Sequence, residues 1–283
     1  MRKLVFILAI ILLFCVFAFS AWKLWAYFSE SAETQSDYDA LSQLRQEAIP
    51  VIKPEDTAPD PPIDATAPTE TEPDPYAGLV QMTDVETGEE VWMRPEFCSL
   101  FAINPDIIGW ISIEGTHVDY PVVHRPENKD YYLYRTFHGK QLMRGCIYAR
   151  EECDVLKPSD NITIYGHMMQ DSTMFADLHN YTSKAFWEDH KYIRFDTLRQ
   201  TGLYEVICVF KTSATRGQGF SYHLFIDFKD QDQLDAFWDG CQEGAFYDTG
   251  LTPTLGDKLI TLSTCEYTLQ NGRLVVVARR ISD

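Results

Sequence analysis

The sequence lacks the cysteine patterns that build disulfide frameworks or structural zinc sites. Its seven cysteines, at positions 15, 98, 146, 153, 208, 241 and 265, include no Cys-x-x-Cys pair, and their number is odd. A disulfide framework uses an even set, and a structural zinc site uses closely spaced ligand pairs. A single isolated disulfide remains compatible with these positions. Otherwise a thiol in this chain serves either as core packing or as a nucleophile.

Basic residues are scarce as well. The chain has 24 Lys and Arg against 42 Asp and Glu, a formal net charge of −18. A chain without a basic surface cannot neutralise phosphates, so we expect no nucleic-acid partner. The acids near the candidate site described below are too scattered to supply the oxygen ligands that calcium requires. We expect no metal and no cofactor.

The longest apolar run is at the N-terminus. After Arg2 and Lys3, residues Leu4–Trp22 carry no charge. As a helix they would be about 28 Å long, close to the ~30 Å hydrocarbon core of a bilayer. The basic pair precedes the run and acidic residues follow it, which predicts a cytoplasmic N-terminus and an extracellular remainder. Residues 1–30 are therefore expected to be a single-pass anchor of the cell membrane.

A cleaved signal peptide is the alternative for this run. Ala18-Phe19-Ser20 weakly resembles a cleavage site. The run is long, however, and Trp22, Trp25, Tyr27 and Phe28 continue it with aromatic side chains suited to a membrane interface. These features favour an uncleaved signal-anchor helix.

An acidic, proline-rich segment follows the apolar run. Leu41, Leu44 and Ala48 recur at helical spacing, which indicates a juxtamembrane helix over residues 31–49. Residues 50–75 contain eight prolines among acidic and small residues, so they cannot bury enough apolar surface to fold. We expect residues 50–75 to be disordered, and residues 31–76 as a whole, with a net charge of −9, to form an extracellular linker. It would tether a globular domain over residues 77–283.

The globular part contains many short strand-like runs and few helical ones. Helices are expected at Pro95–Ile103, at Ser172–Leu178 or somewhat longer, and at Gln231–Glu243. The irregular order of strands and helices argues against a doubly wound parallel sheet. It favours a mostly β fold, a closed or nearly closed antiparallel-rich barrel with peripheral helices. The predicted strands are Ile108–Ile113, His117–Val123, Gly145–Ala149, Asn161–Tyr165, Tyr192–Asp196, Leu203–Thr212, Lys258–Thr264 and Leu274–Arg279.

Three chemically reactive side chains lie at the ends of predicted strands. Cys265 follows the run Lys258–Thr264, Arg273 precedes the run Leu274–Arg279, and His167 follows Tyr165-Gly166. If the last two runs pair antiparallel, the seven residues between Cys265 and Arg273 return the chain so that these two residues lie side by side. A thiol, an imidazole and a guanidinium together suit covalent acyl transfer.

Each of the three residues also has an ordinary structural interpretation. A free cysteine is most often inert core packing. His167 competes with six other histidines and could simply be satisfied by a backbone carbonyl. Arg273 by itself suits a surface ion pair at the rim of a sheet. The residues alone leave these alternatives open.

Five segments together form a recognisable pattern: Asn104–Ile111 (NPDIIGWI), Tyr120–Val123 (YPVV), Tyr165–His167 (YGH), Thr261–Cys265 (TLSTC) and Arg273–Val276 (RLVV). They resemble the sortases, membrane-anchored cysteine transpeptidases of Gram-positive bacteria. The resemblance spans nearly all of the globular part, and the TLxTC segment with an upstream His and a downstream Arg is highly specific. The N-terminal helical region and a helix-containing insertion over residues 221–250 resemble features of class B sortases.

The resemblance implies an eight-stranded sortase-type β-barrel and a role for each reactive residue. Cys265 would be the nucleophile that attacks the threonine carbonyl of a C-terminal sorting signal. His167 would be the general acid and base, and Arg273 would position the oxyanion or the substrate. The thioacyl-enzyme would then transfer a surface protein to an amine of peptidoglycan. Four further residues correspond to substrate-binding positions of the class B groove: Leu133, Tyr165, Ser263 and Glu266.

Several points stay open within the resemblance. The family's Gly-His-Asn-Met reads Gly166-His167-Met168-Met169 here, and Lys129 stands where an asparagine is often found. Leu133 and Tyr165 could equally be barrel packing, and no carboxylate that orients His167 can be assigned. A protein encoded nearby that ends in an Asn-Pro-x-Thr-like motif, an apolar span and a basic tail would identify the substrate.

Three other functions are compatible with the same residues. A thiol hydrolase would release the same substrates to water, and a pilin-polymerising sortase would join them to one another. A non-catalytic anchored binding module would have no need of Cys265. A papain-like protease is disfavoured because its cysteine precedes its histidine, whereas here the order is reversed.

Overall fold

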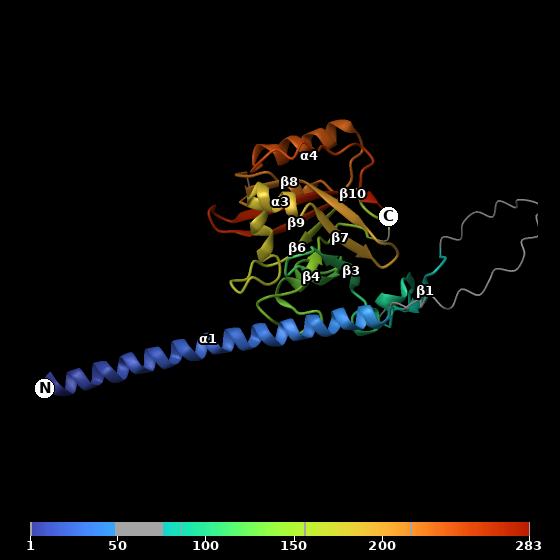
Figure 1. Ribbon diagram of the computed structural model, residues 1–283. Helices are drawn as coiled ribbons and strands as arrows, with labels where there is room; N and C mark the ends of the chain where they lie inside the picture. Colours follow the sequence, from blue (N-terminus) through green and yellow to red (C-terminus); the bar gives the residue numbers. More distant parts are fainter. Residues whose placement is uncertain (1, 49–75, 86, 156, 216, 283) are drawn as a thin grey trace, which may run out of the picture. The chain divides into compact units, whose positions relative to one another are not determined.

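A computed structural model describes residues 2–48, 76–85, 87–155, 157–215 and 217–282 (Figure 1). The predicted disordered linker over residues 50–75 lies outside the described residues. The chain divides into two units, residues 1–43 and residues 44–283.

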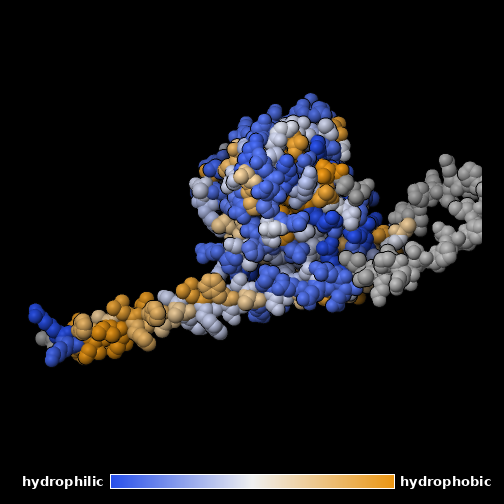
Figure 2. Space-filling model, viewed as in Figure 1, coloured by the Kyte–Doolittle hydropathy of each residue, from blue (hydrophilic) through white to orange (hydrophobic). Residues whose placement is uncertain are grey.

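One long helix, α1 (Arg2–Glu47), accounts for the first unit. Its large apolar side chains from Leu4 to Phe28 are exposed, and they form the orange stretch near the N-terminus in Figure 2. By length and composition this helix can cross a membrane. The helix predicted over residues 31–49 is present up to Glu47, and it continues without a break from the apolar run.

The second unit contains eight strands that close into a barrel in the order β10-β8-β7-β3-β4-β5-β6-β9. Six neighbouring pairs are antiparallel, and β4–β5 and β6–β9 are parallel. The predicted antiparallel-rich barrel is confirmed. The strands are β3 (Ile107–Ser112), β4 (Asp119–Val123), β5 (Ile147–Ala149), β6 (Asn161–Tyr165), β7 (Tyr192–Thr197), β8 (Leu203–Ser213), β9 (Leu259–Glu266) and β10 (Gly272–Ser282).

Two predicted strands begin two residues later than expected, for local reasons. The strand expected from His117 begins at Asp119 because the backbone amide of His117 donates to Asp177 instead of to a neighbouring strand. The strand expected from Gly145 begins at Ile147 because Gly145 has φ 60°, a left-handed turn conformation. The hairpin β1 (Val80–Thr83) and β2 (Glu90–Met93) was not predicted, since its strands are short and largely exposed.

The helix prediction at Ser172–Leu178 is wrong in position. Ser172 and Met174 have φ of 62° and 59°, which a right-handed helix does not allow. A 3₁₀-helix, η3 (Ala176–Thr182), follows them instead. The helix expected at Pro95–Ile103 is divided into η1 (Pro95–Phe97) and α2 (Cys98–Ile103). The remaining short helices, not predicted, are η2 (Tyr131–Tyr134), α3 (Lys184–Asp189) and η4 (Tyr222–Leu224).

The predicted helix at Gln231–Glu243 is confirmed as α4. Asp230 caps it by accepting a hydrogen bond from the Gln233 amide. Its buried residues, Leu234, Phe237 and Cys241, share one apolar cluster with residues of β8, β9 and β10. Figure 1 shows α4 lying over these strands. The insertion at 221–250 thus covers one face of the strands β9 and β10, which carry Cys265 and Arg273.

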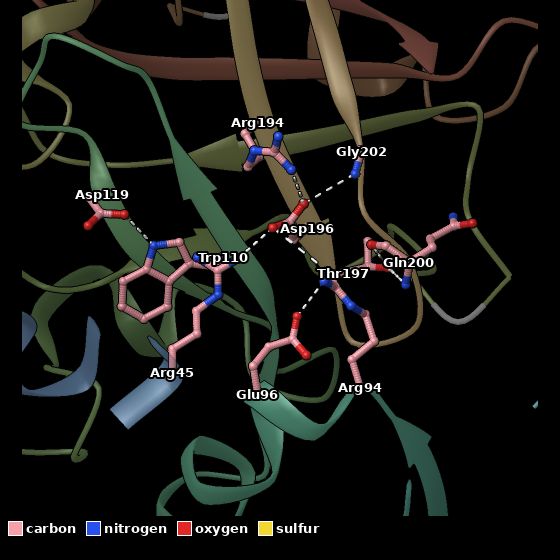
Figure 3. Close-up of polar contacts among 10 residues, drawn as sticks. All are labelled: Arg45, Arg94, Glu96, Trp110, Asp119, Arg194, Asp196, Thr197, Gln200 and Gly202. Carbon is pink, nitrogen blue, oxygen red and sulfur yellow. Dashed lines mark hydrogen bonds and ion pairs between the residues drawn. The ribbon is translucent and has the colours of Figure 1, made fainter. Parts of the chain in front are cut away.

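A buried carboxylate joins distant segments of the second unit (Figure 3). Asp196 of β7 is 2% exposed and accepts a hydrogen bond of 2.5 Å from Arg45, at the end of α1. Arg94 and Arg194 approach the same carboxylate to 3.9 and 3.5 Å. The Arg45 guanidinium also lies over the ring of Trp110, 5.4 Å from its centroid. Arg45, although part of α1, therefore makes its ionic and ring contacts with residues of the barrel.

Candidate active site

Strand pairing brings the predicted site residues to one end of the barrel. Cys265 of β9 is paired directly with Arg273 of β10. On the other side of β9, Tyr165, the last residue of β6, is paired with Ser263, and His167 follows two residues later. The structure therefore places all three reactive residues at the ends of adjacent strands, as the sequence predicted.

Cys265 differs from most of the other cysteines in its exposure. All seven cysteines lie in the described part of the chain, and all are free. Cys265 is partly exposed, whereas Cys146, Cys153, Cys208 and Cys241 are buried. Burial raises the pKa of the Cys153 thiol to about 11 and that of Cys208 to about 12. The four buried thiols are packing groups, so Cys265 is the cysteine at this end of the barrel that can meet a substrate.

A cavity of about 280 Å³ lies at this end of the barrel. His167, Cys265 and Arg273 all line it, together with three of the four predicted substrate-binding residues, Leu133, Tyr165 and Ser263. Its other lining residues are Lys129, Asp130, Tyr148, Arg150, Glu151, Gly166, Ala214, Tyr222, His223 and Thr264. A thiol, an imidazole and a guanidinium thus face one space from three strand ends.

The tautomer of His167 follows from its hydrogen bond. Its Nε2 lies 2.7 Å from the backbone oxygen of Leu133. A carbonyl oxygen only accepts, so Nε2 carries the proton and Nδ1 is the nitrogen able to take one up. The ring of Tyr134 stacks on the imidazole, with centroids 5.7 Å apart. The orienting partner that the sequence could not assign is therefore a backbone carbonyl in η2.

A glycine is required before His167 by close packing. A Cβ added at Gly166 would lie 2.7 Å from ring atoms of Phe175, which is fully buried. It would also lie 2.5 Å from Ile147. Because these neighbours leave no room for a side chain, the backbone that carries His167 is held close to the barrel wall.

Arg273 is held at the turn between β9 and β10. Its guanidinium donates hydrogen bonds to the backbone oxygens of Gly272, at 2.9 Å, and Asn271, at 3.3 Å. Asn271 has φ 51°, a left-handed conformation that asparagine tolerates and that tightens this turn. The guanidinium is a fixed positive charge at the cavity, as predicted for the rim of the sheet.

Glu266 has a different environment from the other predicted substrate-binding residues. It does not appear among the residues that line the cavity. Its carboxylate accepts hydrogen bonds from the backbone amides of Thr268 and Leu269, at 2.9 and 3.2 Å. Burial alone would raise the pKa of this carboxyl, but the hydrogen bonds outweigh it and the pKa is lowered. In this structure Glu266 stabilises the turn between Cys265 and Arg273.

Sequence reasoning missed several residues of the cavity, among them Tyr222, Arg150 and His223. Tyr222 of η4 is buried, and its hydroxyl lies 2.6 Å from Oγ of Ser263. Arg150 is 8% exposed and forms hydrogen bonds with Tyr165 and Glu152. Burial, together with the charge of Arg150, lowers the pKa of His223. Tyr222 and His223 lie within the insertion at 221–250, so the insertion was the one signal that could have pointed to them.

Comparisons with known proteins agree with this geometry. The family model of the sortase domain matches residues 111–281. The chain is 33% identical over 191 residues to a sortase B of Staphylococcus aureus, covering 67% of this chain and 76% of the relative. It is 28% identical over 194 residues to a sortase B of Listeria monocytogenes, with the same coverage of both chains.

Solved structures give the same result. The structure of a Staphylococcus aureus sortase B–substrate complex superimposes with a TM-score of 0.61 and 32% identity, covering 67% of this chain and 86% of that one. The family match covers more than half of the chain, and the closed eight-stranded barrel resembles the solved sortase B structures. The chain belongs to the sortase family, and within it to class B.

Proposed function

We propose that this chain is a cysteine transpeptidase that cleaves a C-terminal sorting signal after its threonine and transfers the protein to a peptidoglycan amine. The observation that carries the proposal is the shared cavity of His167, Cys265 and Arg273. A partly exposed thiol beside a guanidinium and an imidazole meets the needs of covalent acyl transfer.

The proposed reaction has two acyl transfers. The Cys265 thiolate attacks the threonine carbonyl, and the guanidinium of Arg273 stabilises the charge that develops on the oxygen. When the peptide bond breaks, the imidazolium of His167 gives its Nδ1 proton to the leaving amine, and a thioester remains on Cys265. An incoming amine then attacks the thioester and loses a proton to Nδ1. The thiolate is released, and the protein is joined to the amine.

The proposed location follows from the N-terminal helix. As an uncleaved anchor with a cytoplasmic N-terminus, it would place the barrel on the outer face of the cell membrane, where sorting-signal proteins and peptidoglycan amines meet. Residues 31–76 would follow the anchor outside the cell, and Arg45 among them pairs with Asp196 of the barrel. The proposed partners are therefore surface proteins that carry sorting signals, a cell-wall amine and the membrane itself.

Mass spectrometry of the products tests this proposal. The full chain, in lipid nanodiscs, is incubated with a pool of peptides containing Asn-Pro-x-Thr-x, with and without triglycine as the amine. We expect a peptide cleaved after threonine and joined to triglycine. Cys265→Ala should abolish product formation, whereas Cys98→Ala, a change at the other partly exposed cysteine of the barrel unit, should not. Full activity of Cys265→Ala would refute the proposal.

The same experiment separates the alternatives. A thiol hydrolase would give only the free threonine acid, even with triglycine present. With a lysine-containing protein added as a second acceptor, a pilin-polymerising sortase would join the peptide to the lysine side chain in preference to triglycine. A non-catalytic binding module would bind the peptide and give no product with the wild-type chain.

A further inference from the structure

The backbone oxygen of Cys265 has an unusual partner. It accepts a hydrogen bond of 2.9 Å from Nε2 of His179, a residue of η3 that lies 86 positions earlier in the chain. His179 is partly buried. Because a carbonyl only accepts, Nε2 of His179 carries the proton.

Strand geometry explains why this oxygen needs a partner from outside the sheet. The backbone oxygen of Ser263 accepts a hydrogen bond of 3.2 Å from the amide of Gly166, on the β6 side of β9. Carbonyls two residues apart on a strand point to the same edge, so the oxygen of Cys265 also points toward the β6 side. There β6 has already ended at Tyr165. His179 occupies the position where a longer β6 would have supplied an amide.

The same segment also bonds the backbone of His167. The amide of Phe175, the residue before η3, donates a hydrogen bond of 2.9 Å to the backbone oxygen of His167. The Phe175 side chain is fully buried against Gly166. Residues 175–179 therefore hold the backbone of His167 at one end and that of Cys265 at the other.

We propose that His179 is a positioning residue of the active site, which holds the free end of β9 so that the Cys265 thiol keeps its place relative to His167. This inference rests on the proposed transpeptidase function. His179 does not line the cavity, so it acts through the Cys265 backbone and not on the substrate. A displacement of about 1 Å between reacting groups can cost up to a hundredfold in rate.

Three variants of the full chain in nanodiscs test the proposal. His179→Ala removes the donor, and His179→Gln retains an N–H donor at similar reach. Thr182→Ala is the matched control, because it removes a hydrogen bond from the Thr182 hydroxyl to the backbone of His179 within η3 and leaves the Cys265 oxygen bonded. Hydrogen exchange of the peptide covering residues 259–270 reports on the end of β9. Turnover of the best peptide of the pool with triglycine gives kcat and KM.

We expect His179→Ala to accelerate hydrogen exchange at the end of β9 and to lower kcat about tenfold, with KM unchanged within twofold. His179→Gln should restore both quantities, and Thr182→Ala should change neither. The melting temperature of all three variants should stay close to that of the wild-type chain. A purely structural role predicts instead that activity and melting temperature fall together and that glutamine does not rescue them.

Two results would overturn the proposal. The first is unchanged hydrogen exchange at the end of β9 in His179→Ala, and the second is faster exchange with wild-type kcat. Cys265→Ala keeps this test distinct from that of the proposed function. If Cys265→Ala is fully active, the transpeptidase proposal fails. If it is inactive while His179→Ala turns over normally, only the positioning role fails.

Discussion

Cys265 and Arg273 are direct cross-strand partners in the β9–β10 ladder. Residues paired in this way on antiparallel strands have their side chains on the same face of the sheet. The seven residues between them form a turn that Glu266 stabilises through two backbone amides. The backbone of one hairpin therefore brings the thiol and the guanidinium to the same face of the sheet.

Arg273→Ala should lower kcat about a hundredfold, because it removes the positive charge proposed to stabilise the oxyanion. Arg273→Lys should recover only part of this loss, since an ammonium lacks the planar fork of the guanidinium. Peptide turnover with triglycine measures both. Arg279→Ala is the matched control: Arg279 lies on the same strand but at its other end, beside Glu205 and Asp257. An equal loss in the control would contradict the assigned role.

Gly166→Ala should destabilise the barrel by about 1–3 kcal/mol, since its Cβ would overlap the buried ring of Phe175. It should also lower kcat, because the displaced backbone carries His167. Urea unfolding and peptide turnover measure the two effects. In the double variant with Phe175→Leu, the smaller side chain should make the combined loss of stability less than additive. Strict additivity would show that this contact is not the cause.

Asp196→Asn should lower the free energy of unfolding by about 3 kcal/mol, because it leaves the Arg45 guanidinium without its carboxylate in a largely buried site. Arg194→Ala should cost about 0–1 kcal/mol, because the Arg194 side chain is 52% exposed and its 3.5 Å contact with the same carboxylate is solvated. Urea unfolding of the full chain in detergent compares the two variants. Equal losses would mean that the buried pair with Arg45 contributes no more than the surface pair.

Glu266→Gln should remove a contribution to stability that depends on pH in a defined direction. The folded state lowers the pKa of Glu266 from 4.5. As the pH falls past that value, the unfolded state therefore binds more protons than the folded state. The ionised carboxylate therefore stabilises the wild-type chain above about pH 4.5, and this contribution is lost as the pH falls through the folded-state pKa. Thermal melting at pH 7 should show the variant less stable, with the difference shrinking below pH 4.5.

The exposed Glu127 supplies the control for this pH series. Glu127→Gln removes the same charge without removing an acceptor for backbone amides in the β9–β10 turn. A difference in melting temperature between the wild-type chain and Glu266→Gln that stays constant from pH 7 to pH 3 would contradict the role of the ionised carboxylate.

Local patterns were sufficient to predict most of the barrel. The strands of alternating or β-branched residues were all found, because burial on a pleated sheet selects such residues along a few consecutive positions. Predictions failed where backbone conformation was decided by individual residues, as at Ser172 and Met174 with their positive φ. The two short strands β1 and β2 were also not predicted, because they bury too few side chains to give an alternating apolar pattern.

The sequence by itself determined which strands form the barrel, that an apolar helix precedes them, and that Cys265 and Arg273 face each other, because all of these depend on neighbours within one element or one hairpin. Only the tertiary structure decided what holds these residues in place. The Leu133 carbonyl on His167 and the His179 imidazole on the Cys265 backbone join residues 34 and 86 positions apart. Contacts of that kind depend on how the barrel closes, and no local pattern records them.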